Sequence, residues 1–144
     1  MHKAVVKMWS RSIFVFFGLV TLTYAKLELP PELQDYADEL HDLCIKRTGI
    51  TEDDHLAYDI INNPHDEKLQ CYIKCLMLEA NWMNKDGVIQ YDWIEENLHQ
   101  DIKEIVIAAL RKCKTINEGA NLCEKASHFN ACMYEADREN WFLV

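Results

Sequence analysis

The stretch Pro64–Met83, which reads PHDEKLQCYIKCLMLEANWM, places Cys71 and Cys75 four residues apart. On a helix, side chains at this spacing project from nearly the same face, and a disulfide between them would close a loop that one helical turn already closes. We therefore expect each sulfur to reach a different part of the fold. With Asn63 as its cap, Pro64 in its first turn and apolar residues recurring at threes and fours, the stretch is predicted to be the buried spine of a helical domain.

The first 25 residues have the pattern of an export signal. A basic leader containing Lys3, Lys7 and Arg11 precedes an apolar run, 13–22, and Ala25 supplies a small residue for cleavage. Because this run is about half the length that spans a bilayer, a signal peptide at 1–25 is favoured over a membrane anchor. The remaining residues, 26–144, have the length of one domain.

Charge and cysteine content limit the class of protein. Without the leader the chain holds 12 basic residues against 24 acidic ones, a net charge of −12 that opposes binding to nucleic acid or anionic lipid. All six cysteines follow the leader. In an exported chain an even number indicates disulfides, and composition alone leaves the pairing open. Each disulfide contributes about 2–4 kcal/mol, so three of them would stabilise a domain whose core is partly hollow.

The spacing of apolar residues predicts about six short helices, and no segment shows the alternation of a strand. Besides the spine, helices are expected over about 31–47, after a capping box at Thr51 and Asp54, over about 91–98, from a cap at Asp101 to about Cys113, and after a second capping box at Asn121 and Glu124. Leu56, Ile60 and Ile61 are expected to form the buried side of the second of these helices. The fold class is therefore all-α.

The cysteines follow the pattern Cys44-x26-Cys71-x3-Cys75-x37-Cys113-x9-Cys123-x8-Cys132. The x3 and x8 gaps resemble the signature of the six-cysteine insect odorant-binding proteins, the pheromone and general odorant-binding family. The segments Pro30-Pro31-Glu32-Leu33, Leu122-Cys123-Glu124-Lys125-Ala126 and the terminal Phe142-Leu143-Val144 also look like its short-tailed, mosquito-like members. The resemblance covers essentially the whole chain after the leader.

This resemblance implies a pairing, a function and a site. The pairing is Cys44–Cys75, Cys71–Cys123 and Cys113–Cys132, with the helices surrounding an internal apolar cavity. The function is a secreted carrier that takes small hydrophobic odorants or pheromones through sensillar lymph to a membrane olfactory receptor, without a cofactor. The positions that match the family's pocket wall, together with one spine residue expected to converge on them by helical spacing, are Leu76, Tyr91, Ile94, Leu98, Val106, Ala109, Leu110, Met133, Phe142 and Leu143.

The apolar terminus, Trp141–Val144, follows a strongly polar segment and is expected to be covered rather than free in water. In similar proteins the terminal carboxylate accepts hydrogen bonds from the first helix and from a tyrosine next to the second cysteine. The matching donors are His41 and Tyr72, with Val144 as the acceptor, which would make the tail a latch over the pocket. The alternative is a tail that packs as ordinary core closure.

Other classes of protein fit the sequence less well. No nucleophile, zinc-protease or phosphate-loop motif is present, so an enzyme is not expected. Zinc binding by Cys71 and Cys75 with His41 or His128 is disfavoured, because oxidised sulfurs cannot act as thiolate ligands. A secreted helical interaction protein with a solid core is the main alternative. A saposin-like lipid module is disfavoured, because the closely spaced cysteine pairs that such modules have at both ends are missing from this sequence. A homodimer stays open.

Overall fold

The computed structural model describes residues 29–144, and the predicted signal peptide lies outside the described residues. Six helices and no strand are found in this part of the chain, which confirms the all-α prediction. In order they are α1 (Pro31–Thr48), α2 (Glu52–Leu56), α3 (Glu67–Glu79), α4 (Tyr91–Asn97), α5 (Gln100–Lys112) and α6 (Leu122–Ala136). None of them is both long and apolar enough to cross a membrane.

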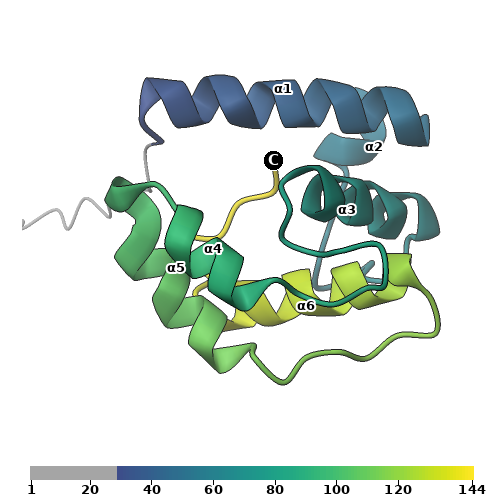
Figure 1. The fold of residues 1–144 in the computed structure, drawn as a ribbon. Helices are drawn as coiled ribbons and strands as arrows, with labels where there is room; N and C mark the ends of the chain where they lie inside the picture. Colours follow the sequence, from purple (N-terminus) through teal and green to yellow (C-terminus); the bar gives the residue numbers. More distant parts are fainter. Residues whose placement is uncertain (1–28) are drawn as a thin grey trace, which may run out of the picture.

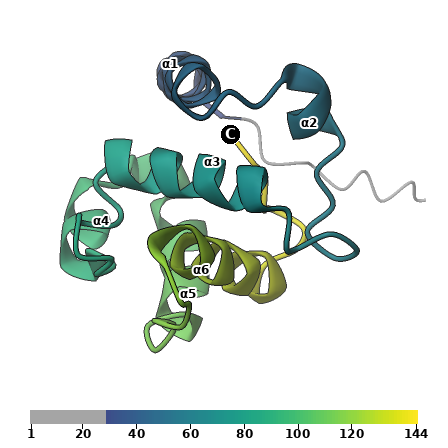
Figure 2. The ribbon, with the colours of Figure 1, turned by 90° about the vertical axis from the view of Figure 1, so that its right-hand side faces the viewer.

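Helix α3 is the central element. It packs against α6 on one side and α1 on the other, so that α1, α3 and α6 form three tiers (Figure 2). Helices α4 and α5 lie beside each other at one end of the molecule (Figure 1). The largest buried cluster includes Ile73 and Met77 of α3, Ile94 of α4, Leu110 of α5 and Phe129 of α6. The spine prediction therefore holds for the middle of the stretch.

Three disulfides join these tiers. Cys44–Cys75 ties α1 to α3, Cys71–Cys123 ties α3 to α6, and Cys113–Cys132 ties the end of α5 to α6. These are the pairs that the family resemblance implies. Cys71 and Cys75 reach two different helices, as their spacing on one face of α3 predicts. Every described cysteine is bonded.

Two predicted helix starts are wrong. Helix α3 begins at Glu67, because the Asp66 side chain accepts the N–H of Leu69, whereas Pro64 lies before the helix in a turn. Helix α5 begins at Gln100 with His99 as its cap, and Asp101 is the second residue of its first turn. Asn63 and Asp66 are both preferred cap residues, so residue type alone did not choose between them, whereas His99 is a less common cap type than Asp101.

The predicted buried side of α2 is also wrong. The capping box is present, because Thr51 accepts the N–H of Asp54 and Asp54 accepts the N–H of Thr51. The helix ends at Leu56 after a single turn, before the apolar stripe is complete. Leu56 is 79% exposed and Ile61 is 60% exposed, so this short helix does not bury an apolar face.

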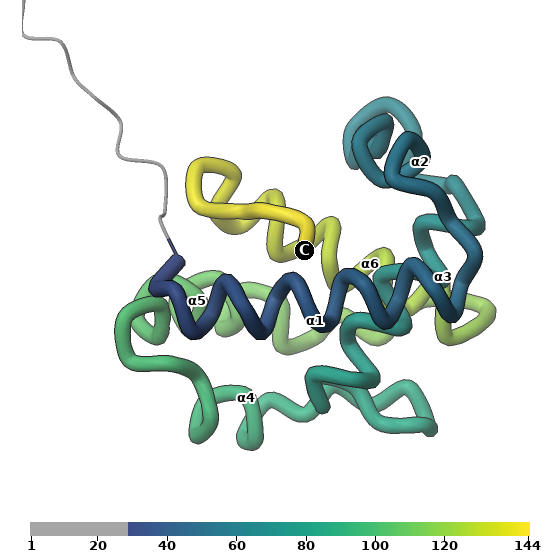
Figure 3. Tube along the Cα trace, turned by 90° about the horizontal axis from the view of Figure 1, so that it is seen from above, coloured from purple at the N-terminus to yellow at the C-terminus, as the bar shows by residue number. Residues whose placement is uncertain are grey.

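Helix α1 and the C-terminal tail enclose one side of the molecule. Helix α1 ends where Gly49 adopts the left-handed conformation that glycine favours and donates its N–H to the carbonyl of Ile45. Residues 137–144 turn back from α6, and the chain ends between α1 and α3, beside the middle of α1 (Figures 1, 2 and 3). The tail is therefore positioned between the helices rather than at the periphery.

Candidate ligand-binding cavity

A cavity of about 590 Å³ lies between α1, the tail and the buried cluster. Its wall draws on helices α1, α3, α4, α5 and α6 and on the tail. Most of the lining side chains are aliphatic or aromatic, and a few polar ones lie among them, including Asn97, Asn130 and Asp137. A mostly apolar cavity of this size is typical of a site for a small organic molecule.

Helix α1 presents different surroundings along its length. Leu33, Tyr36, Ala37 and Leu40 of its N-terminal half line the cavity, whereas Cys44 near its C-terminal end is fully buried against α3. These residues recur at threes and fours and therefore lie on one side of the helix. The same apolar stripe thus covers a hollow at one end and a packed core at the other.

Helix α5 shows a similar division around its axis. Ile102, Ile105 and Val106 line the cavity and are partly buried, whereas Ile107 and Leu110 are buried in the core cluster. Because 3.6 residues make a turn, Val106 and Ile107 point about 100° apart although they are neighbours in sequence. One helix therefore supplies both a cavity wall and a core face.

Eight of the ten predicted pocket residues lie on the cavity wall, namely Leu76, Ile94, Leu98, Val106, Ala109, Met133, Phe142 and Leu143. Whether they hold a ligand stays a prediction. Tyr91 and Leu110 lie elsewhere. Tyr91 packs its ring against Phe129 and donates its hydroxyl to the carbonyl of Cys113, and Leu110 is 1% exposed inside the core cluster. Both positions match the family's pocket wall and lie on apolar helical stripes, but neither signal distinguishes a core from a cavity wall in this chain.

Sequence reasoning missed several lining residues. Trp82, Trp93 and Trp141 all contribute to the wall, and Trp141 donates its ring N–H to the Oδ1 of Asn130 at 3.2 Å. The N-terminal half of α1 was also missed, together with Ile102 and Ile105. The helical stripes that contain Leu33 and Ile102 were visible in the sequence, but nothing in the stripes showed that they face a space.

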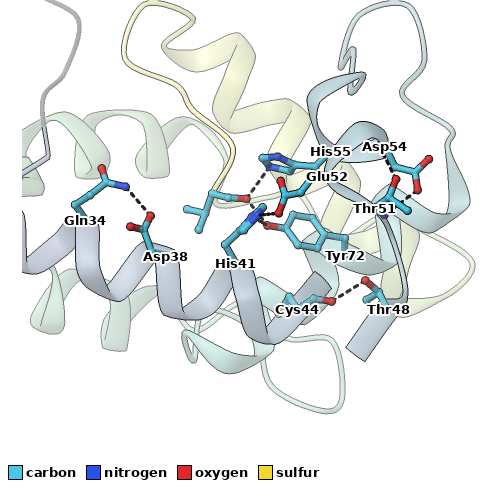
Figure 4. A network of polar contacts seen from close by, with 11 residues as sticks. Gln34, Asp38, His41, Cys44, Thr48, Thr51, Glu52, Asp54, His55 and Tyr72 are labelled. Atoms are coloured by element: carbon cyan, nitrogen blue, oxygen red, sulfur yellow. Dashed lines mark hydrogen bonds and ion pairs between the residues drawn. The ribbon is translucent and has the colours of Figure 1, made fainter. Parts of the chain in front are cut away.

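The end of the tail contacts a polar cluster formed by α1, α2 and α3. The main-chain oxygen of Val144, the last residue of the sequence, accepts a hydrogen bond from the hydroxyl of Tyr72 and lies 3.0 Å from Nε2 of His55. His41 does not reach Val144 and instead places its Nδ1 2.7 Å from the Tyr72 hydroxyl (Figure 4). The structure therefore differs from the predicted latch, since His55 occupies the place expected for His41.

Tyr72 is the central donor of this cluster. Its side chain is fully buried, and its pKa is raised by burial and, to a smaller extent, by the negative charge of Glu52. The hydroxyl therefore keeps its proton and acts as a donor over the whole physiological pH range. His55 was missed because it comes from the short helix α2, where the sequence shows only an isolated histidine after a capping box.

A small, disulfide-linked helical shell around an apolar cavity defines a class of protein, the carriers of small hydrophobic molecules. The sequence pattern of one such family, the PBP/GOBP family, matches residues 26–136. The chain belongs to this family of odorant-binding proteins, whose members are carriers and not enzymes. The family is generally extracellular.

Two relatives from Drosophila melanogaster are similar over most of their length. General odorant-binding protein 99a is 32% identical over 126 residues, which cover 85% of each chain. General odorant-binding protein 19d is 24% identical over 139 residues, which cover 90% of this chain and 91% of the relative. The similarity thus extends beyond the cysteines to the full domain.

Solved structures share the fold. Odorant-binding protein 1 of Locusta migratoria is 29% identical, with a TM-score of 0.65 over 79% of this chain and 88% of its own. A fatty acid binding protein from the oral disk of the blowfly Phormia regina is 29% identical, with a TM-score of 0.58 over 78% and 98%. Odorant-binding protein 7 of Anopheles gambiae, solved in complex with an azo compound, is 25% identical, with a TM-score of 0.61 over 78% and 91%.

Proposed function

We propose that this protein binds small hydrophobic odorants or pheromones in the cavity and carries them through the aqueous fluid of a sensillum to olfactory receptors. The observation that carries the proposal is the cavity of about 590 Å³ with mostly apolar walls. Two structural relatives support the ligand class, because one binds an azo compound and another is a fatty acid binding protein. The alternative, a helical interaction protein with a solid core, does not predict such a cavity.

The cavity size sets the expected affinity. A ligand that hides about 300 Å² of apolar surface gains about 7 kcal/mol at about 25 cal/mol per Å². Association costs several kcal/mol of this, and a cavity that is already formed keeps the cost at the low end. Polar contacts to side chains such as Asn97 or Tyr36 add to the gain for ligands with a suitable group. A Kd of about 1 µM corresponds to about 8 kcal/mol, so a ligand of this size that relies on apolar burial alone should bind more weakly than that, and micromolar binding requires more buried surface or such polar contacts.

The tail closes the cavity in this proposal. Residues Trp141–Val144 all contribute to the cavity wall, and their end is fixed by the hydrogen bonds of Val144 with Tyr72 and His55. A ligand that enters or leaves between α1 and the tail must break these bonds or bend around them. The tail would then set the rate of exchange more than the affinity itself.

Displacement of a fluorescent apolar probe tests the carrier function. Alcohols, aldehydes, esters, indoles and fatty acids of increasing length should compete, and molecules larger than the cavity should not. Ala109→Trp, which places an indole where the cavity wall is now a methyl group, should weaken probe binding at least about tenfold, because a filled cavity has no room for the probe. Failure of the whole panel, or normal binding by Ala109→Trp, would contradict the proposal.

Deletion of 141–144 tests the closing role separately. Stopped-flow measurement of probe release should show faster dissociation than in the intact chain, since the truncated chain leaves the side of the cavity open. Val144→Ala is the matched control, because it shortens one side chain and leaves the main-chain oxygen and its bonds in place. Equal release rates for the truncated and intact proteins would remove the tail from the mechanism.

A further inference from the structure

The polar cluster at the end of the tail contains groups that do not contact Val144 and that can bind a metal ion, namely His41 and Glu52. His41 of α1 and Glu52 and His55 of α2 each place one donor atom within 4.8 Å of the others (Figure 4). Glu52 and His55 are three residues apart, so α2 presents both from one side. Two imidazoles and one carboxylate form a donor set that binds Zn²⁺ in other proteins.

The hydrogen bonds determine which nitrogen of His41 carries a proton. The main-chain oxygen of Val144 can only accept, so the Tyr72 hydroxyl donates its one proton to it. The contact of 2.7 Å between Tyr72 and His41 must then use the Nδ1–H of His41 as donor. In the neutral ring this leaves a lone pair on Nε2, which faces Oε1 of Glu52 at 3.0 Å. Two acceptors at this distance repel unless a proton on Nε2 or a metal ion lies between them.

The same reasoning applies to His55. Its Nε2 lies 3.0 Å from the Val144 oxygen and must donate to it, which leaves a lone pair on Nδ1. The rings of His41 and His55 lie edge to face with centroids 4.6 Å apart. In their neutral forms both imidazoles thus have one N–H held by an oxygen and a lone pair on the other nitrogen. Histidines that bind metals are fixed in this way, with the other ring nitrogen donating to an oxygen.

We propose that His41, Glu52 and His55 bind a divalent transition-metal ion of the zinc class. Donors in a tetrahedral site with bonds of about 2.1 Å lie about 3.4 Å apart, so the groups need to move by about 1 Å. Glu52 makes this movement easily, because its side chain is 64% exposed. The bound ion connects α1 and α2, and through Tyr72 and His55 it orders the oxygen that fixes the tail. This inference is independent of ligand transport.

Isothermal titration of the untagged, disulfide-bonded protein with zinc chloride at neutral pH tests the site without any odorant present. We expect one ion per chain with a Kd of about 10 µM or tighter. Mg²⁺ and Ca²⁺ should not compete, because they prefer sites made of oxygens alone. At a hundredfold excess of zinc over Kd, Tm should rise by about 10 °C. Co²⁺ should give the intense visible absorption of a tetrahedral complex.

Substitutions identify the ligands. Glu52→Gln should weaken zinc binding at least about tenfold, and because this side chain is exposed the variant keeps its fold. His41→Gln and His55→Gln should each do at least the same. His65→Gln and His128→Gln are matched controls outside the cluster and should bind as the parent does. Absence of saturable binding, or equal losses in the control variants, would show that only a proton lies between His41 and Glu52 and would overturn the proposal.

Discussion

The molecule has two halves that look alike in sequence and differ in packing. The solid half lies where α3, α4, α5 and α6 pack on one another, and there Leu110 and Cys113 are 1% and 0% exposed and do not line the cavity. The hollow half consists of the N-terminal half of α1, the N-terminal half of α5 and the tail, which enclose the cavity together with residues of α3, α4 and α6. Both halves are built from apolar helical stripes. The comparison teaches that a stripe determines which side of a helix avoids water, whereas the neighbouring elements determine whether that side meets atoms or a space.

The largest effect is expected from removing the disulfide that joins α1 to α3. The double substitution Cys44→Ala with Cys75→Ala removes a link across 31 residues and should lower the free energy of unfolding by about 4 kcal/mol. Probe affinity should fall as well, because the N-terminal half of α1 then no longer holds its place in the cavity wall. Urea unfolding and probe titration measure the two effects.

The matched control for this change lies in the solid half. Replacing Cys113 and Cys132 removes a link across 19 residues and should cost about 3 kcal/mol. Its effect on affinity should be smaller, since neither cysteine lines the cavity. An equal loss of affinity in the two double variants would show that the halves do not act separately.

A pair of leucines tests the comparison with the same chemical change on each side. Leu110→Ala in the solid half should lower the free energy of unfolding by about 3 kcal/mol, because it leaves an empty volume in a packed core. Leu33→Ala on the cavity wall should cost less than about 1 kcal/mol, because its side chain already borders a space. Affinity should change in the opposite order, with a loss only for Leu33→Ala.

Substitution of Tyr91 is expected to have a smaller effect on stability, and the size of this effect should depend on pH. Tyr91→Phe should cost about 1 kcal/mol near neutral pH by removing the hydrogen bond to the Cys113 carbonyl, with no change in probe affinity. Burial raises the pKa of Tyr91 above its ordinary value. The folded protein therefore holds this proton when the unfolded chain has lost it, and the stability that Tyr91 supplies decreases as pH rises above about 10.

The difference in the free energy of unfolding between the parent protein and Tyr91→Phe should accordingly become smaller from pH 9 to pH 11, as measured by urea unfolding. Other tyrosines titrate in both proteins, so their contribution cancels in the difference. A difference that stays constant with pH would mean that the hydroxyl is not shielded from water. Reduced probe binding by Tyr91→Phe would indicate that Tyr91 contributes to the cavity wall.

Much of the fold was available from the sequence, because local signals agree with the tertiary structure there. Gly49 ends α1 as expected, and Asn121 caps α6 by accepting the N–H groups of Cys123 and Glu124. The start of α3 was misplaced because Asn63 and Asp66 are both good caps. In the structure the N–H of Asn63 donates to the carbonyl of Asp59, so Asn63 belongs to a separate turn.

The site was predictable only in part. Residues such as Val106 and Met133 were placed by resemblance to a family, and the structure puts them on the cavity wall. Tyr91 and Leu110 were placed by the same resemblance, but their neighbours fill the space around them. His55 carried no local signal, since its role depends on a contact with Val144, which is 89 residues away in the sequence. Contacts across such distances depend on the completed fold.

The smallest effect should come from α2, which contributes polar groups to the end of the tail but no buried apolar side. Leu56→Ser should change the free energy of unfolding by less than about 0.5 kcal/mol, because a side chain that is 79% exposed loses little burial. Probe affinity should be unchanged, since Leu56 does not line the cavity. Urea unfolding beside the parent protein measures the difference. A loss of about 2 kcal/mol would instead indicate that this face is covered in solution, by a second copy of the chain or by a closer approach of α2, and would extend the solid half to this helix.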